Sequence, residues 1–321
     1  MIDSLNFTLI GVVKRQLYNF DTTFRRCSRD FVYTRNYKSI HFNFFLLHQC
    51  LTLTTHTSKV LRRNNVKEDD IIEYLDNLET IIKEVVNINE INLKLTRCDY
   101  NIDLKVSSQE ELKEIFVLLN KHHKKFKYIE SKQDYPNSVY LCKPKGSIGI
   151  NIYDKFSQIL NEYNYEDENF RNVVRIELQL KKRKIQRLYK KQDVARDIKK
   201  YWCRETMEQQ YFDYLKDYLY VGDYYKLSKA KEIIFSSTYS NTIKKGLIKF
   251  VTEINHYGIT PTSKNYSYGT SKKYIQLLNE LKLNPITIND DCNIDMIENI
   301  LNRARKVAEV TKFKDIKKIK N

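Results

Sequence analysis

The chain has 321 residues, which is long enough for one large domain or two ordinary ones that bury a core without disulfides or structural metals. A formal net charge of +16 favours a polyanionic partner, nucleic acid before an acidic membrane surface, although a sequence rich in Lys, Asn, Ile and Tyr is also typical of an AT-rich genome. Six widely spaced cysteines argue against a zinc ribbon or a disulfide scaffold, and no run approaches the roughly 18 apolar residues of a membrane span, so we expect a cytoplasmic protein without a membrane partner.

The periodicity of apolar residues predicts strands and helices in an α+β order. Leu5, Phe7 and Leu9 alternate as in a first strand, and the aromatic and β-branched residues of 31–53 predict two or three more. The apolar residues of 69–86 follow the spacing of one helix face. The elements expected next are a strand over 91–106, a helix with a capping box from Ser108 to Glu111, short strands near 125–130, 137–142 and 148–154, and a stronger strand over 172–181.

The pattern becomes helical and polar beyond Lys182, and this change indicates a domain boundary. We predict a catalytic domain over 1–190, with a largely antiparallel central sheet covered by helices, and a mainly helical C-terminal region over 191–321. Helical spacing at 242–256 and 270–281 allows two interpretations, a helix–turn–helix that docks on DNA or an accessory module that packs on the sheet.

Three of the expected strands carry polar side chains at alternate positions, opposite a row of apolar ones. Side chains of one parity line one face of a sheet, so these groups converge if the three strands are neighbours. A sheet with one solvated face shows the same alternation, but aspartate is depleted in strands. The residues on this polar face are Arg97, Asp99, Asn101 and Asp103 in the first strand, Asn151, Tyr153 and Lys155 in the second, and Arg175, Glu177 and Gln179 in the third.

Such a polar face suits phosphodiester chemistry. Carboxylates are hard oxygen ligands for Mg²⁺ or Mn²⁺, and a bound ion can polarise a phosphodiester and orient it for in-line attack. A tyrosine can act as a covalent nucleophile once its phenol is activated, by a metal, by Lys155 or by a base. Arg175 can hold a phosphate oxygen through two donors and stabilise the transition state.

Several short segments, in order along the chain, resemble those of a known family. They are MIDSL at the start, the strands LTRCDYNIDL, INIYDK and VVRIELQLK, and the later segment SYGTSKKYIQLLNELKL. Together they resemble the filamentous-phage gene II/gene X replication proteins and, more loosely, the Rep_trans plasmid initiators and relaxases. The resemblance implies initiation of plasmid or phage rolling-circle replication: a metal-dependent endonuclease nicks one origin strand, becomes joined through tyrosine to the 5′ phosphate, and later reseals the strand.

The same resemblance assigns roles to individual residues. Tyr153 matches the nucleophile, with Lys155 and Arg175 as accompanying catalytic cations. Asp99 and Glu177 match the metal ligands, and the family's use of a divalent ion makes Mg²⁺ or Mn²⁺ the expected cofactor. A third ligand, Asp103, matches the plasmid group better than the phage group, and Gln158 stands where many relatives have Glu.

Other residues have alternative interpretations. Adjacent histidines on a strand point to opposite faces, so His122 and His123 are poorly arranged to hold one ion. Tyr100 is expected in the core, and Tyr163 and Tyr165 are either a second nucleophile or exposed aromatics. Two basic stretches either bind DNA phosphates or form solvated charged faces, and the residues expected to bind DNA are Lys124, Lys125, Lys127, Lys181, Lys182 and Arg183.

The expected partners are duplex and single-stranded origin DNA. A host helicase is also expected, because the chain has no G-x-x-x-x-G-K-[ST] loop for ATP, together with a host DNA polymerase. Two other functions remain open. One is a conjugative relaxase with the same chemistry, and the other is a non-catalytic DNA-binding plasmid or phage protein whose acidic residues serve only in ion pairs.

Overall fold

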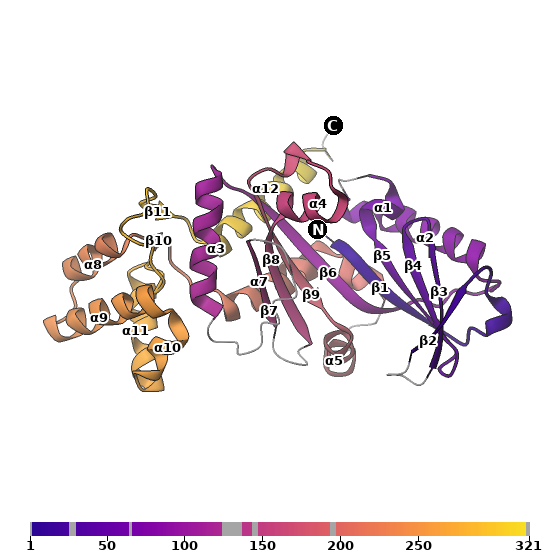
Figure 1. The fold of residues 1–321 in the computed structure, drawn as a ribbon, viewed down its shortest axis with the longest axis horizontal. Helices are drawn as coiled ribbons and strands as arrows, with labels where there is room; N and C mark the ends of the chain where they lie inside the picture. The colour runs from indigo at the N-terminus through magenta and orange to yellow at the C-terminus, as the bar shows by residue number, and fades with distance from the viewer. Residues whose placement is uncertain are drawn as a thin grey trace. The chain divides into compact units, whose positions relative to one another are not determined.

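The computed structural model of this chain describes residues 2–25, 30–63, 66–123, 137–142, 147–192 and 197–318 (Figure 1). The strands are β1 (Ile2–Ile10), β2 (Asp21–Arg25), β3 (Asp30–Tyr37), β4 (Ile40–Phe45), β5 (Cys50–His56), β6 (Lys94–Lys105), β7 (Ser138–Cys142), β8 (Ile148–Asp154), β9 (Val173–Leu180), β10 (Tyr224–Tyr225) and β11 (Met296–Ile297). The α-helices are α1 (Thr57–Leu61), α2 (Ile71–Val85), α3 (Gln109–His123), α4 (Lys155–Tyr163), α5 (Lys182–Gln192), α6 (Ile198–Trp202), α7 (Arg204–Tyr218), α8 (Leu227–Ser236), α9 (Asn241–Tyr257), α10 (Ile259–Lys264), α11 (Tyr268–Glu280) and α12 (Ile300–Lys318).

The α+β class predicted from the sequence is confirmed. Strand β1 coincides with the first expected strand, and β3, β4 and β5 account for the segment 31–53. Helices α2 and α3 and strands β6 to β9 begin and end within a few residues of the predicted bounds. Strand β2 was not predicted, and the short strand expected near 125–130 lies outside the described residues.

The chain divides into two compact units, and the first contains an antiparallel sheet. Unit 1 comprises Met1–Asn101, Lys145–Gly149 and Glu177–Tyr211, and its strands follow the order β2-β3-β4-β5-β1-β6-β9. The apolar side chains of β1, β4 and β5 are buried on one face, and α1 and α2 lie along these strands (Figure 1). A buried hydrogen bond of 2.6 Å between the hydroxyls of Thr55 and Tyr74 ties α2 to that face.

Unit 2 comprises Ile102–Pro144, Ile150–Ile176 and Phe212–Asn321. Its strands follow the order β6-β9-β8-β7, and α3 packs beside β7. The helices α8 to α11 gather on the other side of α3 (Figure 1). An ion pair of 2.5 Å between Arg303 of α12 and Glu111 of α3 joins the last helix to this unit.

Both units are assembled from three separated segments, because β6, β8 and β9 run from one unit into the other. The single boundary expected near residue 190 does not describe this division, and the two sequence-based domains stay a prediction. None of the helices in the described part of the chain is long and apolar enough to cross a membrane.

Gly222 holds a position that only glycine fits, and Gly222→Ala is expected to destabilise unit 2. Its φ of +92° lies in the left-handed region, and an added Cβ would stand 2.4 Å from the backbone carbon of Leu283. Gly11 is a matched control, because it has a similar φ of +83° but nothing within 4 Å of an added Cβ. Chemical denaturation should show a loss of about 3 kcal/mol or more for Gly222→Ala and about 1 kcal/mol for Gly11→Ala. Equal losses would contradict the close approach.

Candidate functional site

The three polar strands are neighbours in unit 2, where the order is β6-β9-β8. Their apolar parity is as predicted, since Ile152, Val174 and Ile176 are fully buried. The residues on the opposite, polar face of these strands are buried as well, because Tyr153 is only 6% exposed and Arg175 only 9%. Alternation in the sequence correctly separated the two faces, but the polar face of β8 and β9 is buried and is not an ordinary solvated face.

Lys155 differs from its expected place on the strand. Strand β8 ends at Asp154, which caps α4 by accepting hydrogen bonds from the backbone amides of Phe156 (3.1 Å) and Ser157 (3.4 Å). The Ser157 hydroxyl also donates to Asp154, at 2.6 Å. Lys155 is therefore the first residue of a helix, because an aspartate N-cap satisfies amides that a continued strand would leave to a neighbouring strand.

Tyr153 nevertheless lies close to Lys155. The Lys155 ammonium is 6.0 Å from the centre of the Tyr153 ring and 5.7 Å from that of Phe170. The Arg175 guanidinium is 5.8 Å from the same Phe170 ring. Within unit 2, Lys155 and Arg175 thus share the Phe170 ring, and Lys155 also lies over the ring of Tyr153. No feature of the sequence indicated a role for Phe170.

Asp103 binds Arg175 and does so through both carboxylate oxygens. The Arg175 Nε donates to Oδ1 at 2.6 Å, and Nη2 donates to Oδ2 at 2.7 Å. This two-pronged geometry is the strong form of an arginine–carboxylate contact, and it fixes the plane of the guanidinium. In this structure Asp103 acts on Arg175, whereas the sequence had assigned it as a third metal ligand.

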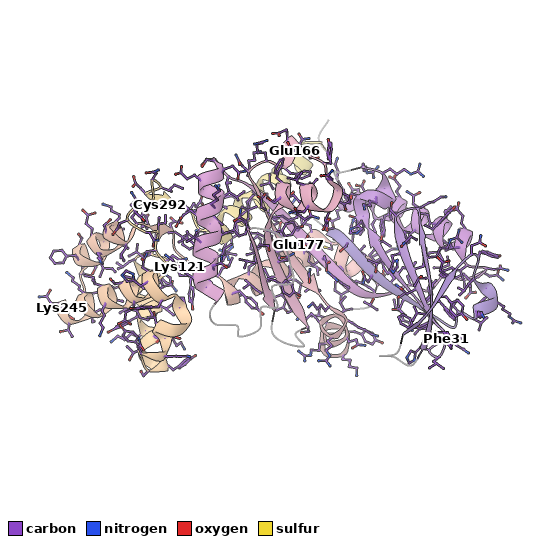
Figure 2. All side chains as sticks on the ribbon, in the orientation of Figure 1. Phe31, Lys121, Glu166, Glu177, Lys245 and Cys292 are labelled. Carbon is purple, nitrogen blue, oxygen red and sulfur yellow. The ribbon has the colours of Figure 1, made fainter. Side chains whose placement is uncertain are left out.

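Asp99 lies in unit 1 and is buried within a similar arrangement. Arg97 donates to it through Nε at 2.8 Å and through Nη2 at 2.7 Å, and the Ser4 hydroxyl donates at 2.7 Å. Glu177 belongs to the same unit, on the buried part of β9 (Figure 2). Arg97 was expected on the same polar face of β6 as Asp99, whereas Ser4 carried no signal in the sequence, because its contact depends on how β1 pairs with β6.

These contacts do not fit an ion held jointly by Asp99, Glu177 and Asp103. Both oxygens of Asp99 and both oxygens of Asp103 already accept hydrogen bonds from other side chains. Within the described ranges, no three His, Cys, Asp or Glu side chains gather in a group that could hold a metal ion. Metal dependence stays a prediction.

The remaining candidates fall into three sets. Tyr100 is a core residue whose hydroxyl donates to the Tyr201 carbonyl at 2.8 Å, and burial raises its pKa well above the ordinary value. Tyr163 and Tyr165 are 58% and 61% exposed.

The ring of His122 is buried and stacks on Tyr220, with ring centres 5.4 Å apart. The side chain of His123 and the predicted DNA-binding residues Lys124, Lys125 and Lys127 lie outside the described residues, whereas Lys181, Lys182 and Arg183 lie where β9 passes into α5.

Comparison with models of known protein families and with curated proteins finds no match for this chain. The residues and their geometry therefore carry the functional argument.

The sequence-based expectation of a DNA-nicking enzyme would make Arg175 a catalytic residue and Asp103 the residue that positions it, and two variants test this expectation. Arg175→Ala should lower DNA nicking by about 10²- to 10³-fold, the loss typical of removing one donor to a transition state. Asp103→Asn keeps the shape of the side chain and one acceptor, so nicking should fall less than about tenfold. The measurements are the nicking rate and the unfolding midpoint of each variant, which together distinguish a loss of activity from a loss of stability. Equal losses with unchanged unfolding would contradict a positioning role for Asp103.

Proposed function

We propose that this protein nicks one strand of DNA by transesterification through Tyr153 and so initiates rolling-circle replication of a plasmid or phage. The observation that carries the proposal is the chain of contacts in which Lys155 lies over the Tyr153 ring and shares the Phe170 ring with Arg175. A tyrosine and two cations supply groups that attack on a phosphodiester requires, because the hydroxyl is the nucleophile and the cations offset charge on the phosphate oxygens.

The proposed reaction conserves one phosphate ester. The Tyr153 oxygen forms a bond to phosphorus, the bond from phosphorus to the 3′ oxygen breaks, and the phenolic proton ends on the leaving 3′ hydroxyl. The strand is then held through its 5′ phosphate, and the 3′ hydroxyl is available to a polymerase. Reversal of the same step reseals the strand without ATP, since the energy of the phosphodiester is retained in the tyrosyl link.

Each cation has a separate part in this proposal. Lys155 donates a hydrogen bond to Gln158 at 2.6 Å, which holds its ammonium on the first turn of α4. Arg175 is held in a fixed plane by Asp103, so its charge is preorganised and does not have to be ordered during the reaction. Because Tyr153 is almost fully buried, binding of a DNA strand has to be accompanied by a local rearrangement that exposes its hydroxyl.

A divalent ion belongs to the proposal through Asp99 and Glu177. Mg²⁺ commonly uses only one or two protein carboxylates and completes its shell with water and substrate phosphate. An ion at Asp99 would have to replace the hydrogen bonds from Arg97 and Ser4. Origin DNA, a host helicase and a polymerase are the proposed partners, and conjugative transfer by the same chemistry is an equal use of this site.

A second function is favoured by one specific observation. Asp99 and Asp103 are each engaged by an arginine, which is what a DNA-binding protein without nicking activity would show if its acids served only in ion pairs. The two functions are separated by incubating the protein with single-stranded origin DNA and Mn²⁺ and then denaturing it. The nicking proposal expects a covalent protein–DNA adduct, and salt-sensitive binding without any adduct would favour the second function.

A further inference from the structure

The sheet of unit 1 has a second face, opposite to the face that packs against α1 and α2, and this second face carries mainly polar side chains. Residues directly opposite in an antiparallel pair share a face, and Asn6 lies opposite both Thr54 and Arg97. In the next row Thr8 lies opposite Thr52, which lies opposite Asn43. This face is therefore built mainly from hydroxyl and amide side chains with one arginine, while Leu5, Phe7, Leu51 and Leu53 are buried on the other face.

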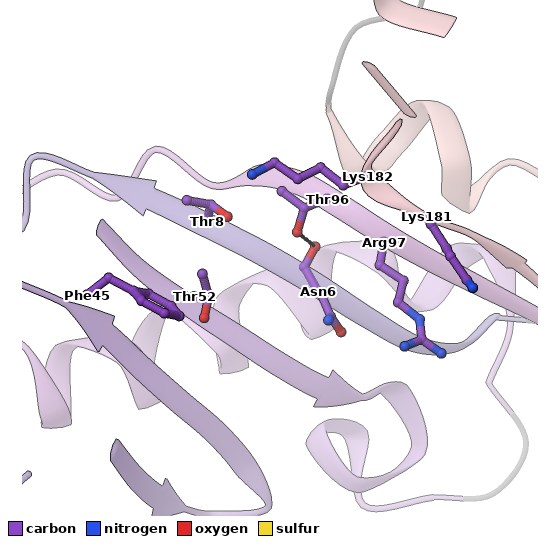
Figure 3. A pocket seen from close by; sticks show the side chains of 8 residues that line it. All are labelled: Asn6, Thr8, Phe45, Thr52, Thr96, Arg97, Lys181 and Lys182. Atoms are coloured by element: carbon purple, nitrogen blue, oxygen red, sulfur yellow. Dashed lines mark hydrogen bonds between the residues drawn. The ribbon is translucent and has the colours of Figure 1, made fainter. Parts of the chain in front are cut away.

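A groove of about 290 Å³ opens on this polar face (Figure 3). Its floor consists of the neutral side chains of Asn6, Thr8, Thr52 and Thr96. This volume is at the small end of ligand sites in proteins, so it suits a unit of roughly nucleotide size better than a large cofactor. Threonine is common on solvated strands, so the floor alone identifies no ligand.

Positive charge stands at one end of the groove. Arg97 and Lys181 line this end, and Lys182, the first residue of α5, also lines the groove, with its side chain extending toward Thr8 (Figure 3). The sequence of α5, KRKIQRLYKKQ, has six cations and no acid in eleven residues, and its apolar residues Ile185 and Leu188 are buried. The N-terminal end of a helix adds further positive potential, so this end of the groove is suited to a phosphate.

An aromatic ring stands at the other end of the groove. Phe45, the last residue of β4, lies across the threonine floor from Arg97 and Lys181 (Figure 3). A phenylalanine beside a basic groove is the usual platform for an unpaired base, because every base has a face that can stack. Bases within a duplex already stack on one another and do not present that face.

We infer that this groove binds a nucleotide of single-stranded DNA, with its phosphate at Arg97, Lys181 and Lys182 and its base on Phe45. Basic residues at 181–183 were expected to bind DNA from the sequence, but the ring, the neutral floor and the preference for a single strand follow only from the fold. The inference rests on the proposed function for its choice of DNA. In this inference, the groove holds the DNA strand beside Asp99, the carboxylate that accepts a hydrogen bond from Arg97.

The test measures binding of a fluorescent single-stranded oligodeoxythymidine to the full chain by anisotropy at several salt concentrations. Phe45→Leu keeps an apolar side chain but removes the ring, and it should raise Kd by about 5- to 100-fold, the range for loss of one stacked base. Phe45→Tyr keeps the ring and should bind within about twofold of the wild type. Lys182→Ala should lower the slope of log Kd against log salt by about 0.7, as expected for one phosphate contact.

Lys83→Ala is the matched control, because it removes the same charge from α2 on the helix-covered side of the sheet. It should leave the salt slope unchanged. The inference fails if Phe45→Leu binds like the wild type, if Lys83→Ala and Lys182→Ala have the same effect, or if a duplex of equal length competes as well as the single strand. None of these measurements involves Tyr153, so an absent covalent adduct with intact groove binding would defeat the nicking proposal alone.

Discussion

Tyr153→Phe is expected to abolish the covalent adduct with single-stranded DNA and to lower nicking by at least about 10³-fold, as loss of a nucleophile does in other enzymes with covalent intermediates. The change removes one hydroxyl and leaves the ring in its contact with the Lys155 ammonium, so the fold should be retained. Denaturing electrophoresis of the protein with labelled origin DNA measures the adduct, and anisotropy in the same buffer measures binding, which should remain.

Tyr163→Phe and Tyr165→Phe are the matched controls, since both residues are exposed and belong to the chain just after the Tyr153 strand. Both variants should form the adduct at the wild-type rate. An adduct formed by Tyr153→Phe but lost in one of these variants would transfer the nucleophile to that tyrosine.

Removal of divalent ions is expected to abolish nicking activity, and addition of Mg²⁺ or Mn²⁺ should restore it. The physical reason is that Asp99 and Glu177 would hold the ion, which would supply positive charge to a bound phosphate. Asp99→Asn and Glu177→Gln each replace a charged ligand by a weaker neutral one, so the Mn²⁺ concentration for half-maximal nicking should rise by about tenfold or more. The measurement is a nicking assay over a titration of Mn²⁺ after chelation.

Asp103→Asn serves as the control for this titration, because both oxygens of Asp103 are bonded to Arg175. Its half-maximal Mn²⁺ concentration should match that of the wild type. Full nicking in excess chelator would defeat the metal proposal while leaving the role of Tyr153 intact. A shift for Asp103→Asn as large as that for Asp99→Asn would return Asp103 to the set of ligands.

Local periodicity was sufficient to predict most of the elements and to separate the faces of the central strands. Ile152 and Ile176 are buried as expected, because a strand alternates regardless of its neighbours. Periodicity gave no information on what covers the other face, since that depends on segments distant in the chain. Lys155 was misplaced for a local reason, because the strand alternation was continued to Lys155, whereas the side chain of Asp154, the last residue of β8, caps a helix that begins there.

The contacts of the candidate site were less predictable than its residues. Asp99 and Arg175 were identified by residue type, but their partners Ser4 and Asp103 depend on strand pairing, which the sequence does not specify. The groove was missed for a similar reason. Asn6, Thr8 and Thr52 are neutral residues that carry no functional signal in the sequence. Only the antiparallel register of the strands brings their side chains together on one side of the groove.

The direct passage from β8 into α4 has a mechanical consequence for the nucleophile. The backbone amide of Asp154 donates to the Asn137 carbonyl at 3.0 Å, and its side chain caps the helix, so no loop lies on either side of this junction. The main chain at Tyr153 therefore has no hinge, and the freedom left to the hydroxyl is rotation about its own side-chain bonds. In the proposed nicking reaction, the scissile phosphate would therefore have to reach a tyrosine whose main chain is held between a strand and a capped helix.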